Sequence, residues 1–138
     1  MNIVLTCINN FQPYILLNIK QLIYLGHTQI YVITNFEFFE LFNEYISKIT
    51  LISIEELTES YDFIKKTKLN SNFRNGFWVL TSARFFYIQA FMKKYNVENI
   101  IHLENDVLIY YNCDQLNNKI NKNYIYLPFD TFKNCISL

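Results

Sequence analysis

The chain has 138 residues, of which 51% are hydrophobic, 18% aromatic and 17% charged. This composition excludes intrinsic disorder, which needs low hydrophobicity and high net charge, and the length fits one domain, residues 1–138. The 12 basic and 12 acidic side chains cancel, so no basic excess is present to collect nucleic-acid phosphates, and we expect no nucleic-acid partner.

The first part of the chain alternates between strand-like and helix-like patterns. Short β-branched runs that end in polar residues predict buried parallel strands, and apolar residues every three or four positions predict helices. Pro13 precedes the first helix and Gly26 follows it, where these residue types are favoured. The expected elements are strand 3–8, a helix with apolar positions 15–23, strand 29–34, helix 38–45 and strand 50–54.

The second part predicts one long helix among shorter elements. This helix begins at Phe77, after a polar loop that carries Arg74, and ends at Asn96. The other expected elements are helix 61–68, strand 100–103, a turn or short helix at 114–116 and strand 124–127. Strands that alternate with helices are typical of an α/β fold with a mostly parallel sheet and helices on both faces.

Polar residues stand where the first two predicted strands end. They are Thr6, Asn9, Asn10, Thr34 and Asn35. Parallel α/β sheets bind ligands at the carboxyl ends of their strands, which makes these side chains candidate ligand contacts. Each of them can also cap a turn or a helix, so both interpretations stay open.

Two acids, Glu104 and Asp106, are two positions apart between the apolar runs 100–103 and 107–111. Carboxylates this close at the end of a buried strand repel one another unless a cation neutralises them. Mg²⁺ or Mn²⁺ binds one or two carboxylates and completes its shell with phosphates and waters. The same triplet also occurs as a solvated turn. The context favours a metal and diphosphate site with Glu104 and Asp106 as the metal ligands.

The long helix and the acidic triplet together resemble the GT-A glycosyltransferases. Arg-Phe-Phe-Tyr-Ile at 84–88 precedes Ile-His-Leu-Glu-Asn-Asp-Val-Leu at 101–108, and in that family an arginine-bearing helix precedes a strand that ends in a DxD-type motif. The resemblance spans 3–130 and is strongest over 77–114. It implies a Rossmann-like, nucleotide-diphospho-sugar transferase fold. It also implies metal-dependent transfer of a sugar from a nucleotide diphosphate donor, by default a UDP-sugar, to an unknown acceptor.

The resemblance implies roles for individual residues. Asp106 takes the place of the metal-binding acid, and Glu104, one methylene longer than the usual Asp, takes that of the first acid. Arg84 matches the helix arginine that faces the diphosphate or the sugar, a task that suits its paired N–H groups; it can also pair with an acid. The other expected nucleotide contacts are Thr6, Asn9, Asn35 and Asn105.

Complete members of that family are longer, and they often supply a further metal-binding histidine downstream of the acidic motif. Here both histidines, His27 and His102, precede Asp106, so we expect a short or truncated member. Two rival hypotheses stay open. One is a catalytically incomplete nucleotide-sugar-binding module or subunit of a larger assembly. The other is a flavodoxin-like interaction domain with a coincidental triplet. A homodimer fits the high aromatic content.

The remaining notable side chains have structural interpretations. His102 is expected to be packed and hydrogen-bonded, and Trp78 and the other aromatics of the long helix are expected in the core. Asp130 is interpreted as a turn residue and is the best downstream carboxylate if one joins the site. The three widely spaced cysteines form no CxxC pair and are interpreted as free thiols: Cys7, Cys113 and Cys135. With neither a signal-like start nor an apolar run of about 20 residues, the sequence predicts a soluble, cytoplasmic protein.

Overall fold

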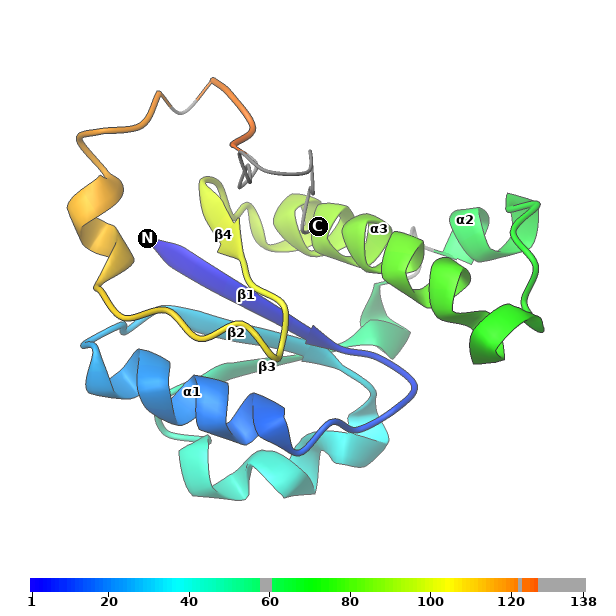
Figure 1. Cartoon of the computed structure of the whole chain (residues 1–138), viewed down its shortest axis with the longest axis horizontal. Helices are drawn as coiled ribbons and strands as arrows, with labels where there is room; N and C mark the ends of the chain where they lie inside the picture. The colour runs from blue at the N-terminus through cyan, green and yellow to red at the C-terminus, as the bar shows by residue number, and fades with distance from the viewer. Residues whose placement is uncertain (58–60, 122, 127–138) are drawn as a thin grey trace, which may run out of the picture.

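The computed structural model of the chain describes residues 1–57, 61–121 and 123–126 (Figure 1). Within these ranges it contains a four-stranded sheet in which every pairing is parallel, in the order β3-β2-β1-β4. The strands are β1 (Asn2–Cys7), β2 (Ile30–Thr34), β3 (Thr50–Ser53) and β4 (Ile100–His102). The four strands predicted up to residue 103 are thus confirmed, and they form a parallel sheet as expected.

β1 forms the centre of the sheet because it pairs with β2 on one side and with β4 on the other. Its residues Ile3, Val4 and Leu5 are each 0% exposed. A parallel strand that is covered on both faces needs apolar side chains in both directions, which explains why the pattern is a continuous run instead of an alternation.

Helices cover both faces of the sheet (Figure 1). On the face of Ile3 and Leu5 lie α1 (Tyr14–Tyr24) and the 3₁₀ helix η1 (Phe36–Tyr45). On the face of Val4 lies the long helix α3 (Phe77–Tyr95). The shorter helices are η2 (Ile54–Glu56), α2 (Tyr61–Lys66), η4 (Phe73–Gly76) and η5 (Cys113–Leu116). The predicted α/β architecture, with helices on both faces, is confirmed.

The strand order reverses beside β1. The chain builds β1, β2 and β3 in one direction and then crosses back along α3 to place β4 on the other side of β1. Helices on opposite faces diverge at such a reversal and leave a crevice at the carboxyl ends of the two strands. The fold therefore positions a ligand site at the ends of β1 and β4.

The ends of α1 agree with the sequence signals. Pro13 is the N-cap residue, and Gly26 follows the helix with φ +83°, in the left-handed region. The His27 N–H donates to the carbonyl of Leu22 at 3.1 Å, and the Gly26 N–H donates to that of Ile23 at 3.0 Å. These two bonds form a Schellman motif, which needs a residue such as glycine at the left-handed position.

Two sequence predictions differ from the structure. Residues 124–126 are not in a strand, and their side chains are 56–91% exposed, because they pack against no covering layer among the described residues; Leu127 lies outside that part of the chain. Trp78 is 51% exposed and not in the core. Phe86 and Tyr95 of the same helix, at 40% and 41% exposure, are also outside the core, whereas Tyr87 and Phe91 are buried, because only one side of α3 packs against the sheet.

Cys7 and Cys113 are free, buried thiols, as expected. Cys135 and Asp130 lie outside the described residues. In the ranges given above, no helix combines the length and the apolar character that crossing a membrane requires.

Candidate functional site

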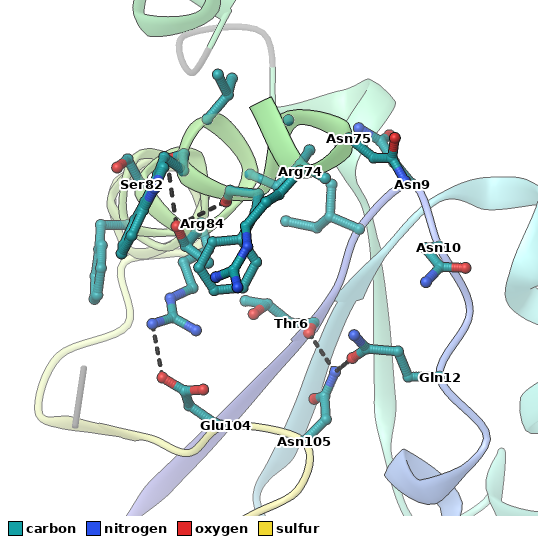
Figure 2. A pocket seen from close by; sticks show the side chains of 18 of the residues that line it. Thr6, Asn9, Asn10, Gln12, Arg74, Asn75, Ser82, Arg84, Glu104 and Asn105 are labelled. Carbon is teal, nitrogen blue, oxygen red and sulfur yellow. Dashed lines mark hydrogen bonds and ion pairs between the residues drawn. The ribbon is translucent and has the colours of Figure 1, made fainter. Parts of the chain in front are cut away.

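A cleft of about 1480 Å³ opens at the carboxyl ends of β1 and β4. Its walls come from three segments, residues 6–14 after β1, residues 71–86 at the start of α3, and residues 104–106 after β4. Figure 2 shows the labelled polar side chains of these segments around one space. The cleft therefore occupies the crevice that the strand order creates.

The two acids of the triplet lie in different surroundings. The Glu104 Oε1 atom is 2.8 Å from an Nη atom of Arg84, and the side chains are 35% and 13% exposed respectively. Asp106 is exposed, lines the cleft, and has no hydrogen bond or ion pair with any described residue. Of the two interpretations of Arg84, the structure shows the pairing with an acid. The cation that neutralises Glu104 here is a guanidinium group.

Asn105 joins the acidic loop to β1. Its side chain is buried, and its amide nitrogen donates to the Thr6 carbonyl at 2.8 Å and to the Gln12 Oε1 atom at 2.7 Å (Figure 2). Its observed contacts are structural, because they hold the Glu104 and Asp106 backbone against the end of β1.

A second buried amide, Asn18 on α1, also holds this loop. Asn18 is 0% exposed, and its Nδ2 atom donates to the carbonyls of Glu104, Asn105 and Val107 at 3.2, 3.3 and 3.0 Å. Sequence reasoning missed this residue. The signal was available, because Asn18 occupies an apolar-face position of α1 between Ile15 and Leu22, where a polar side chain needs a partner.

Asn9 and Asn35 contact each other at the ends of β1 and β2. The Asn9 N–H donates to the Asn35 Oδ1 atom at 2.7 Å, and Asn9 has a φ of 61°.

Thr6 and Asn9 line the cleft, whereas Asn35 is not among its lining residues. The structure therefore brings six of the candidate contacts to the cleft wall: Thr6, Asn9, Asn10, Arg84, Glu104 and Asn105. The predicted metal ligand Asp106 joins them there.

Arg74 is a cleft residue that the sequence did not single out as functional. The chain contains two arginines in 138 residues, and both line the cleft, whereas no described lysine does. Figure 2 shows the Arg74 side chain reaching from η4 toward the strand ends. The scarcity of arginine in this chain was the signal that could have identified Arg74, because only arginine presents a planar fork of N–H donors.

Aromatic side chains form the outer wall of the cleft. Phe77 and Trp78 line it at 44% and 51% exposure, and their rings meet edge to face with centroids 5.0 Å apart. Tyr14, the first residue of α1, also lines the cleft. Burial raises the pKa of Tyr14, and the charge of Asp106 raises it further. Its hydroxyl group therefore stays protonated near neutral pH and can donate a hydrogen bond.

His102 lies behind the ion pair and is packed and hydrogen-bonded as predicted. Its Nδ1 atom is 3.1 Å from the Val4 carbonyl, so a proton on Nδ1 completes that bond. Burial lowers the pKa of His102, and the positive charge of Arg84 lowers it as well. His102 is consequently a neutral structural residue at pH 7.

Comparisons of the chain with protein-family models, with curated proteins and with solved structures gave no match. The function of the cleft is therefore inferred from the chemistry of its own residues.

We predict that Asn18→Ala lowers the free energy of unfolding by about 2–3 kcal/mol, because it leaves buried carbonyls of the acidic loop without their donor. Denaturant unfolding followed by circular dichroism measures the change. Gln21→Ala is the matched control, since Gln21 on the same helix gives one bond, to the Ile109 carbonyl at 3.1 Å, and is partly exposed. Equal losses in the two variants would contradict the role assigned to Asn18.

The lowered pKa of His102 predicts acid sensitivity. The folded state binds a proton less readily than the unfolded state, whose histidine pKa is about 6.5, so stability is retained above that pH and lost as the pH falls below it. His102→Gln should flatten the loss between about pH 6.5 and pH 5 by up to about 1.4 kcal/mol per pH unit. Urea titrations at several pH values test this. His27, whose pKa burial also lowers, keeps part of the slope, and an unchanged slope would refute the prediction for His102.

Proposed function

We propose that the cleft binds a nucleotide diphosphate sugar, with UDP as the default nucleotide, and that the protein transfers the sugar to an acceptor. The observation that carries this proposal is the convergence of two acids and both arginines of the chain at the reversal point of a parallel sheet. Nucleotides bind at this place in open α/β sheets, and guanidinium groups suit diphosphates. The sequence resemblance to GT-A glycosyltransferases supports the same assignment.

A divalent cation is compatible with the residues of the acidic loop. Asp106 offers a carboxylate that no described side chain occupies, and Glu104 keeps one oxygen atom outside its 2.8 Å contact with Arg84. No group of three or more His, Cys, Asp or Glu side chains gathers as a metal site in the described ranges. Mg²⁺ and Mn²⁺ commonly use only one or two carboxylates plus phosphates and waters, so Asp106, with Glu104 as a second ligand, would hold the ion.

In the proposed reaction the bond between the sugar carbon and the diphosphate oxygen breaks, and a bond from that carbon to an acceptor hydroxyl oxygen forms. The acceptor hydroxyl releases its proton to solvent water. The electron pair of the broken bond leaves with the nucleoside diphosphate, which gains negative charge. A bound metal ion supplies Lewis-acid stabilisation of that charge. Arg74 and Arg84 contribute fixed positive charge on one side of the cleft, and Asn105 and Asn18 hold the acidic loop in place.

A non-catalytic binding module is the second candidate function. It is favoured by one observation: Glu104, the first acid of the triplet, is already bound to Arg84 and does not present a free base. Release of free sugar from UDP-sugars with Mn²⁺ separates the two candidates. Slow hydrolysis supports the enzyme, and intact binding without hydrolysis supports the module.

We expect Asp106→Asn to abolish Mn²⁺-dependent binding of UDP, because the amide keeps the size of the side chain but removes its charge. Thermal melting provides an inexpensive measurement, since a ligand at 100 times its dissociation constant adds about 2.7 kcal/mol of stability. Lys94→Ala is the control. Lys94 pairs with Glu56 at 3.0 Å and does not line the cleft, so UDP binding should be unchanged. If Asp106→Asn binds UDP and Mn²⁺ as the wild type does, the metal assignment is wrong.

A further inference from the structure

The two arginines of the cleft differ in what they contact. Arg84 is 13% exposed and forms the 2.8 Å ion pair with Glu104. Arg74 is exposed, and no hydrogen bond or ion pair joins its side chain to any residue in the described part of the chain. An incoming anion can therefore bind the Arg74 guanidinium group without displacing a carboxylate from it.

The backbone at Arg74 is held in an unusual conformation. Arg74, Asn75 and Gly76 have φ values of 47°, 54° and 78°, three left-handed residues in succession. Each non-glycine residue in this region costs about 1–2 kcal/mol, so the surrounding structure must maintain the turn. A Cβ atom at Gly76 would approach the Ser71 carbonyl oxygen to 3.3 Å. This tight turn directs the Arg74 side chain into the cleft, as Figure 2 shows.

The charged groups of the cleft outside the Arg84–Glu104 ion pair indicate what kind of ligand fits. With Arg84 and Glu104 neutralising each other, the described residues that line the cleft leave one positive group, Arg74, and one negative group, Asp106. A diphosphate that carries a divalent cation complements both groups, because its oxygens suit the guanidinium fork and its metal suits the carboxylate. An anion without the metal is attracted by Arg74 and repelled by Asp106.

We infer that Arg74 is the anion-binding residue of the cleft and holds the diphosphate of the ligand, while Arg84 stays on Glu104 as a positioning residue. This inference rests on the proposed function for the identity of the ligand as a nucleoside diphosphate. It differs from the sequence expectation, which assigned the diphosphate to Arg84. An anion at Arg84 would have to share that guanidinium group with Glu104, whose negative charge lies 2.8 Å away and repels it.

Isothermal titration calorimetry on the full chain tests the inference with three probes, each in the presence of Mn²⁺: inorganic pyrophosphate, UDP and uridine. Arg74→Ala should weaken pyrophosphate and UDP binding by about ten- to a hundred-fold, the loss expected for charge-assisted hydrogen bonds, and leave uridine binding unchanged. Arg74→Lys should recover part of the loss, because it restores the charge but not the fork.

Two controls separate anion binding from structure and from general charge. The melting temperature of ligand-free Arg74→Ala should equal that of the wild type, whereas Arg84→Ala should melt lower because Glu104 loses its partner. Lys68→Ala removes an exposed positive charge from the neighbouring loop, outside the cleft lining, and should leave pyrophosphate affinity unchanged.

The outcomes distinguish this inference from the proposed function. Equal pyrophosphate affinity in the wild type and Arg74→Ala, including no binding by either, overturns the inference. Arg74-dependent binding of pyrophosphate together with no binding of UDP supports the inference and overturns the nucleotide assignment. Loss of UDP binding in Arg84→Ala but not in Arg74→Ala returns the diphosphate to Arg84 and also overturns the inference.

Discussion

The parallel pairing of β4 with β1 is the constraint on which the cleft depends. The register aligns Asn2 with Ile100 and Val4 with His102, so the carboxyl ends of both strands point toward the same edge of the sheet. α3 crosses the sheet to reach β4, and its residue Arg84 meets Glu104 across 20 positions of sequence. The ion pair, the acidic loop and the opening of the cleft all follow from this one crossover.

The loop after β4 has little regular structure, and side-chain amides supply the hydrogen bonds to its backbone carbonyls that neighbouring strands would supply in a sheet. Asn18 and Gln21 of α1 donate to its carbonyls, and Asn105 donates to the end of β1. Asn112, further along the chain, joins this segment to the C-terminal end of α1 by donating to the Leu25 carbonyl at 2.9 Å. Buried carbonyls outside a helix or sheet need such donors. These amides therefore have a defined structural task in a chain that is rich in asparagine.

Charge in the cleft is balanced but unevenly distributed. The inner pair of Arg84 and Glu104 is closed and partly buried, whereas the outer groups, Arg74 and Asp106, are exposed and of opposite sign. An arrangement of this kind attracts a ligand that carries both phosphate and a divalent cation, and the proposed nucleotide diphosphate sugar is such a ligand. The exposed Phe77 and Trp78 beside Arg74 add apolar surface for a ring of that ligand or of the acceptor.

The sequence by itself determined the four strands of the sheet, the long helix and the residues where helices end, because continuous apolar runs, Pro13, Gly26 and Asn96 act locally on the backbone. It also identified the acidic loop, since acids that follow a buried run stand out. Local patterns carry no information on which distant groups meet. The partner of Arg84, the loop-holding role of Asn18, the exposure of Trp78 and the placement of Arg74 were decided by tertiary structure. Each depends on how α1, α3 and β4 lie against β1, and therefore on long-range packing that no short window of sequence contains.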